Sequence, residues 1–238
     1  MSLRTSIQRQ RMSAKGGIPQ WMKDANEEYG IPIANLQDAY AIDKNIEFSF
    51  YGDRSRGLLF REANNSIDTG LLINGLYEIE TRFRLDKTNR GWMFVYGSSY
   101  STSTTSNLCI NGSNTQTTAK SFGLQLYQTF DRFDANTYYV RSDNNDFYYH
   151  NETNRVQQTL AFRGGQGIAD GNTFLGKNPL YGWGSFYGKM HFFRITNQGV
   201  TKFFIPFNNN GEATMIDLMA DDCVHNLPSK VGNFTIED

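Results

Sequence analysis

The chain has 238 residues and a net charge of −1 at pH 7, from 23 basic and 24 acidic side chains. This balance gives no global field that would draw the protein onto nucleic acid or an anionic membrane, and no apolar segment approaches the length that spans a bilayer. The 22 glycines, 18 phenylalanines and 13 tyrosines favour strands, turns and an aromatic core. A chain of this length can bury such a core in one all-β domain.

The first 44 residues differ in composition from the rest. Five cations precede the first acid, Asp24, and no apolar run accompanies them, so we expect no signal peptide. We interpret residues 1–44 as an arm that docks onto a larger assembly, with a disordered cationic leader as the alternative. The basic contacts of this arm would be Arg4, Arg9 and Arg11.

A short helix is predicted within this arm. Pro19 stands near its start, Gly30 marks its end, and Trp21 and Met22 lie on an apolar face at helical spacing. Asn35 indicates the start of a second short helical turn. Because a solvated tail has little use for such a face, we predict that Trp21 and Met22 contact a partner.

From residue 46 onward, short apolar and polar runs alternate between turn residues. Residues 77–85 alternate strictly, which indicates a strand with one buried face, and residues 189–207 predict a hairpin around the turn at 197–199. With no βα alternation, the pattern is typical of an antiparallel sandwich or barrel. The predicted strands are residues 46–51, 57–61, 66–70, 77–85, 92–96, 122–127, 137–141, 147–150, 156–162, 173–175, 189–196 and 201–207, and residues 108–110 are a short apolar island in a polar stretch.

Two cysteines and three histidines are candidates for chemistry. We expect Cys109 and Cys223 to be reduced thiols, with a disulfide between them as the alternative. The histidines are scattered, and no Cys–His cluster has metal-ligand spacing. His191 lies inside a predicted strand, so we expect it to be packed or hydrogen-bonded.

Several motifs resemble one fold family. Residues 66–70 read SIDTG, residues 77–83 read YEIETRF, and WMFVYG follows at 92–97. FYGKMHFFRI at 186–195 and MIDL at 215–218 come later in the same order. Together they resemble the laminin-G-like, concanavalin-like jelly-roll domains that are frequent in bacteriophage virion proteins and bacterial surface proteins.

This resemblance implies an all-β, antiparallel jelly-roll sandwich over residues 45–238, with residues 1–44 as an extended or short-helical arm. Ile216 stands where the family usually has a tyrosine, and residues 98–165 align with no family motif. The resemblance therefore says little about the loops, where a ligand of this fold would bind.

The same fold houses retaining glycosidases, which place an acid and a nucleophile on one face of a strand. Glu78 and Glu80 share a face here, but the third position is Arg82. A guanidinium beside two carboxylates favours their charged form, the reverse of what a general acid requires. We therefore expect a solvated strand face with cross-strand ion pairs and no enzymatic activity.

Two sets of residues are candidates for ligand binding. Asp143 and Asp146 offer oxygens that suit calcium, although such clusters equally make turns. Tyr181 and Trp183 alternate with glycines in a predicted loop and form a candidate platform for a sugar ring. Other aromatics lie on predicted strands, and alternation places about half of them in the core. We expect no other cofactor.

We predict a non-enzymatic structural protein of a bacteriophage virion, as a capsid decoration, head fibre or tail component. It would be made in the host cytoplasm and dock onto other virion proteins through its arm. We expect no contact with membranes or nucleic acid, and a homo-oligomer is compatible with this role. The alternative is a carbohydrate-binding module or adhesin that recognises surface glycans. A glycoside hydrolase is the least favoured of the three.

Overall fold

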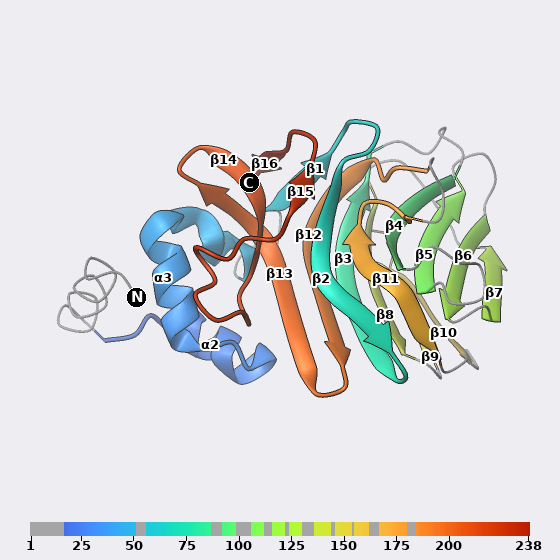
Figure 1. Ribbon diagram of the computed structural model, residues 1–238, viewed down its shortest axis with the longest axis horizontal. Coiled ribbons are helices and arrows are strands. Elements are labelled where there is room, and N and C mark those ends of the chain that lie inside the picture. The colour runs from blue at the N-terminus through green and yellow to red at the C-terminus, as the bar shows by residue number, and fades with distance from the viewer. Residues whose placement is uncertain are drawn as a thin grey trace.

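Two antiparallel sheets pack face to face, and a layer of helices covers part of the outer side of one of them (Figure 1). The predicted sandwich with short N-terminal helices is confirmed. No helix among the described residues is long and apolar enough to cross a membrane. The computed structural model describes residues 17–50, 56–86, 92–98, 106–111, 116–121, 124–129, 136–143, 146–153, 155–161, 167–179 and 184–238.

The larger sheet, sheet A, is organised around the strand β12. One side of β12 pairs with β3, and its other side pairs first with β1 and then with β13. A β-bulge at His191 interrupts the pairing with β3. The strands of sheet A are β1 (Gly57–Phe60), β3 (Tyr77–Leu85), β8 (Thr137–Asp143), β9 (Asp146–Asn151), β10 (Val156–Ala161), β12 (Gly188–Asn197), β13 (Val200–Asn209), β14 (Glu212–Asp217) and β16 (Thr235–Glu237).

Sheet B has the strand order β15-β2-β11-β4-β5-β6-β7. The SIDTG motif begins β2, which continues four residues beyond the predicted end to Asn74. The strands of sheet B are β2 (Ser66–Asn74), β4 (Trp92–Ser98), β5 (Ser106–Asn111), β6 (Gln116–Ser121), β7 (Leu124–Thr129), β11 (Ile168–Leu175) and β15 (Lys230–Val231).

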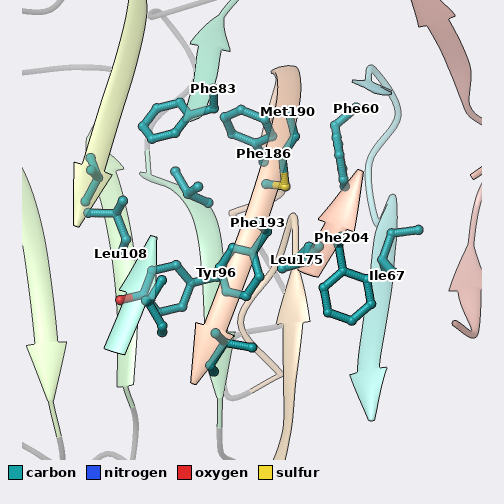
Figure 2. Close-up of a cluster of buried hydrophobic side chains, with 14 of the residues drawn as sticks. Phe60, Ile67, Phe83, Tyr96, Leu108, Leu175, Phe186, Met190, Phe193 and Phe204 are labelled. Atoms are coloured by element: carbon teal, nitrogen blue, oxygen red, sulfur yellow. The ribbon is translucent and has the colours of Figure 1, made fainter. Parts of the chain in front are cut away.

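The main core lies between the two sheets, where the inward faces of their strands meet. The ring centroids of Tyr96 on β4 and Phe193 on β12 are 5.6 Å apart, and Phe186 packs edge-on against Phe60 and Phe83 (Figure 2). Burial of these aromatics is the main stabilising term of the sandwich. Both cysteines are buried and free, as predicted, and burial followed by nearby carboxylates raises the pKa of Cys223 to about 12.

A second core lies on the outer side of sheet A, beneath the helices α2 (Gln20–Tyr29) and α3 (Ile33–Ile42) and the 3-10 helix η1 (Lys44–Ser49). We call these three elements the helical layer. Trp21 and Met22 of α2 are 3% and 0% exposed and belong to the same cluster as Phe203 and Ile205 of β13. In Figure 1 the layer flanks β13 and β14. The outer face of sheet A is therefore apolar only over the strands that the helical layer covers.

A buried ion pair fixes the helical layer to the sheet. Asp43 accepts hydrogen bonds from the backbone N–H of Asn45, at the start of η1, and of Asn208 on β13. Its carboxylate also pairs with Arg56, which directly precedes β1 and is 2% exposed. Removing one partner of such a pair leaves an uncompensated buried charge. The pair thus ties the layer to two strands of sheet A.

Two predictions about the N-terminal segment are wrong. Residues 46–51 were predicted as a strand because apolar residues alternate there, but residues 46–49 belong to η1, whose first turn Asp43 caps. Of the two apolar side chains of η1, Ile46 is buried and Phe48 is exposed. Trp21 and Met22 were predicted to contact a partner protein. Their contacts are with the chain's own sheet, so they are not available to one.

We expect Trp21→Ala to lower the free energy of unfolding by about 3–5 kcal/mol, because it removes a buried aromatic from the second core. Urea denaturation measures this effect. Glu27→Ala, at an exposed position of the same helix, is the matched control and should change stability by no more than about 0.5 kcal/mol. Equal stability of wild type and Trp21→Ala would mean that the helical layer contributes nothing to the fold.

Candidate functional site

The helical layer leaves the outer side of β3, β8, β9 and β10 uncovered by any described helix. We call this half of the sheet the open face. Its side chains are polar, charged or aromatic, whereas the apolar outer side chains of β12, β13 and β14 lie beneath the helical layer. The open face includes Glu78, Glu80, Arg82, Tyr139, Arg141, Tyr148, His150, Gln157 and Thr159.

Strand register arranges these residues in two neighbouring rows. In the first, Arg82, Tyr139, His150 and Gln157 lie opposite one another on successive strands. Residues directly opposite on one face have Cβ atoms about 5 Å apart. This row continues under the helical layer, where Tyr139 packs against Phe192 with centroids 6.5 Å apart. The ring of Tyr139 therefore lies at the border between the open face and the second core.

The second row consists of Glu80, Arg141, Tyr148 and Thr159. The rings of Tyr148 and Tyr139 meet at 65°, with centroids 5.9 Å apart, so an aromatic pair links the two rows. The Tyr148 hydroxyl donates to Oε1 of Gln157 at 3.1 Å. Arg141, Gln157 and Thr159 are exposed, and both tyrosines are partly exposed.

Glu80 is held in place by two donors. It accepts a 2.7 Å hydrogen bond from the Tyr139 hydroxyl and lies 3.3 Å from a guanidinium nitrogen of Arg194 on β12. Burial, then this hydrogen bond, raises the pKa of Tyr139 well above its usual value. The Tyr139 hydroxyl is consequently a permanent donor to the carboxylate, and the pair fixes the orientation of the Tyr139 ring.

The predicted cross-strand ion pairs exist, but the cation differs from the one expected. Arg194 pairs with both Glu78 and Glu80, at 3.5 and 3.3 Å. Arg82 instead donates to Glu152 at 2.7 Å. Sequence spacing showed that Arg82 shares a face with the two glutamates, but strand register decides which cation contacts them.

Of the other sequence-predicted site residues, Asp143 and Asp146 lie at the turn end of the open face, where Asp143 is opposite Glu78. Arg4, Arg9, Arg11, Tyr181 and Trp183 lie outside the described residues. Asp143 accepts a 2.8 Å hydrogen bond from the backbone N–H of Asp146, a contact typical of a turn. Within the described ranges, no group of three or more His, Cys, Asp or Glu residues is placed to hold a metal ion.

The two aspartates of the family-like motifs line a separate cleft of about 310 Å³, between β2 and β13. Lys202 donates to the Thr69 carbonyl at 2.8 Å and lies 3.6 Å from Asp217. Asp217 accepts backbone hydrogen bonds from Phe203 and Met219, and burial raises its pKa. Asp68 accepts from the Gly70 N–H. These bonds join the two sheets and shape turns, so both motifs contribute to the fold.

His191 occupies the bulge of β12 and is 6% exposed. Its Nδ1 lies 2.9 Å from the carbonyl oxygen of Arg56, which can only accept, so Nδ1 carries the proton of a neutral ring. Burial, then the Arg82 guanidinium, lowers the pKa of His191 to about 3. The expectation of a packed, hydrogen-bonded histidine is confirmed.

Sequence reasoning missed the open face as a site, although a signal for it was present. The tyrosine pairs 138–139 and 148–149 each lie on a strand, so alternation places one ring of each pair in the core and one outside. In the structure Tyr138 and Tyr149 are buried, and Tyr139 and Tyr148 face outward. Sequence alone does not say which member of each pair is buried.

No protein-family model matches this sequence, and no curated protein sequence matches it. Solved structures with a similar fold include a native heptameric SAP-like pentraxin from Limulus polyphemus, at 10% identity and a TM-score of 0.41, over 61% of this chain and 77% of the pentraxin. Domains LG4–5 of the mouse laminin α1 chain match at 13% identity and a TM-score of 0.43, over 59% and 40% of the two chains.

A third similar structure, a "putative carbohydrate binding protein" from Bacteroides ovatus, matches at 12% identity and a TM-score of 0.48, over 77% of this chain and 59% of that chain. This chain thus spans less than two thirds of the laminin and Bacteroides chains. At such identities the likeness concerns the sandwich fold alone.

The buried histidine makes stability depend on pH. Because the pKa of His191 is about 3 in the folded chain and 6.5 when unperturbed, the unfolded chain binds the extra proton between these values. The contribution of the neutral ring to stability is therefore complete above pH 6.5 and falls as the pH drops towards 3. Relative to wild type, His191→Asn should lose less stability over this range, by a few kcal/mol.

Urea denaturation at a series of pH values measures that difference. Asparagine keeps a side-chain N–H for the Arg56 carbonyl but cannot titrate. His225→Asn is the control, because the His225 ring is exposed at the surface. Parallel pH curves for wild type and His191→Asn would contradict the buried neutral ring.

Proposed function

We propose that this chain is a non-enzymatic recognition module that binds glycans across its open face. The observation that carries the proposal is the outward-facing pair Tyr139–Tyr148, set among polar side chains of fixed orientation. The C–H faces of a sugar ring pack on aromatic rings, while its hydroxyls bond to planar polar groups. Arg141 and Gln157 supply donors beside the Tyr148 ring.

The polar contacts of the open face favour binding over proton transfer. Glu80 is engaged by Tyr139 and Arg194, and Glu78 also pairs with Arg194. A general acid needs a carboxyl that is protonated near the working pH, and a neighbouring guanidinium opposes that state. These contacts support a role in which the carboxylates orient the tyrosine and arginine side chains.

A second proposal is a structural role in a bacteriophage particle, as a capsid decoration, head fibre or tail component. The motifs that resemble virion domains support it, and so does the sequence before α2, which holds Arg4, Arg9 and Arg11 and no acid. Because the apolar side of α2 packs on sheet A, attachment would rest on this basic segment and not on Trp21 or Met22. A particle protein that also touches host glycans would combine both roles.

Glycan-array binding, followed by titration of the best ligand, tests the first proposal. Tyr148→Ala should weaken binding about tenfold, since it removes a stacking ring, whereas Tyr148→Phe should retain most of the affinity. Gln158→Ala is the control, because this exposed residue of β10 lies opposite the buried Tyr149 and so belongs to the other face of the strand.

Two results would contradict the proposal. Silence across a broad array would favour the structural role in a particle. Binding that disappears with Trp183→Ala but survives Tyr148→Ala would assign recognition to the segment that holds Tyr181 and Trp183.

A further inference from the structure

The strand β10 forms one end of sheet A. In the described part of the chain it pairs with β9 alone, through six consecutive residues without a bulge. Its sequence, VQQTLA, contains no charge and no proline, and Gln157, Gln158 and Thr159 are exposed. A regular, uncharged edge strand offers unpaired backbone N–H and C=O groups to another strand.

The edges at the other end of the sandwich are protected. β15 and β16 are only two and three residues long, and Glu237 of β16 pairs with Arg61 and Lys189. At the β14 edge, Lys230 of β15 donates to the Ala213 carbonyl and pairs with Glu212, both of which belong to β14. Short strands and charged side chains are the usual defence against edge-to-edge association. β10 is neither short nor charged.

We infer that β10 pairs with β10 of a second copy of this chain and extends sheet A across a twofold axis. Self-pairing suits this strand, because a symmetric partner places each residue opposite an identical or equally uncharged one. Residue types at this edge favour strands as well, since Val and Thr are β-branched. A different partner strand with charged side chains would find no opposite charges on β10.

The geometry of the pair follows from symmetry. A twofold axis perpendicular to the sheet makes the two β10 strands antiparallel and keeps both outer faces on the same side. Residues opposite each other must then have side chains on the same face of the sheet. The axis therefore lies midway between the two copies of either Gln158 or Thr159. The open faces of the two copies become neighbours in one continuous surface. The pairing itself does not depend on what that surface binds.

Sedimentation equilibrium of the full chain over a concentration series tests the inference. Wild type should approach twice the 27.2 kDa of one chain. Gln158→Lys and Gln158→Glu should each raise the dissociation constant at least about tenfold, because like charges then lie directly opposite each other with the axis at Gln158, or diagonally with the axis at Thr159. An equimolar mixture of the two variants should restore pairing, since opposite charges meet.

Gln198→Lys, in the exposed turn between β12 and β13, adds the same charge away from β10 and should pair like wild type. Circular dichroism and urea denaturation of each variant separate lost pairing from lost folding. A wild-type chain that stays monomeric at every concentration would overturn the inference. So would a pair that Gln158→Lys leaves intact, because another surface would then hold it together.

Discussion

Phe203, Ile205 and Phe207 point away from the sandwich core, on the side of β13 that would otherwise face water. An outer face this apolar needs a cover, because each exposed phenylalanine or isoleucine forgoes about 1.5–3 kcal/mol of burial. The helical layer is that cover, with Trp21 packed against Phe50 and Phe50 against Phe203. The extent of the open face depends on how far this layer covers sheet A.

Covering one half of sheet A determines what the other half can do. Aromatic side chains form a continuous series of contacts from the helical layer outward, through Phe203, Phe192, Tyr139 and Tyr148. At the buried end the rings stabilise the fold, and at the exposed end they are free to meet a ligand. The same series therefore gives rigidity to the open face, which lowers the entropic cost of binding. It also assigns Trp21 and Met22 to folding.

How far the sequence predicted this structure depends on the range of the interaction involved. The alternation in residues 77–85 predicted β3 with its bounds, and the turn at 197–199 predicted the β12–β13 hairpin. These features depend on neighbours in the chain. The run FFIPF at 203–207 breaks the alternation and indicates a strand buried on both faces, a signal for the helical layer that strand prediction alone did not use.

The candidate site was less predictable because it depends on register between distant strands. The contact of Arg194 with Glu80 joins residues 114 positions apart, and spacing within β3 could not replace it. The outward direction of Tyr139 and Tyr148 likewise depends on which face of sheet A packs on sheet B. Their position beside Gln157 follows from pairing across three strands.

Native-state hydrogen exchange of the full chain tests most directly whether the helical layer is part of the fold. If it is, the slowest amides of α2 and α3 should exchange with the same opening free energy as those of β13, through global unfolding. Helix amides that open at far lower free energy while β13 stays protected would contradict the account. The outer face of β13 would then be stable without its cover.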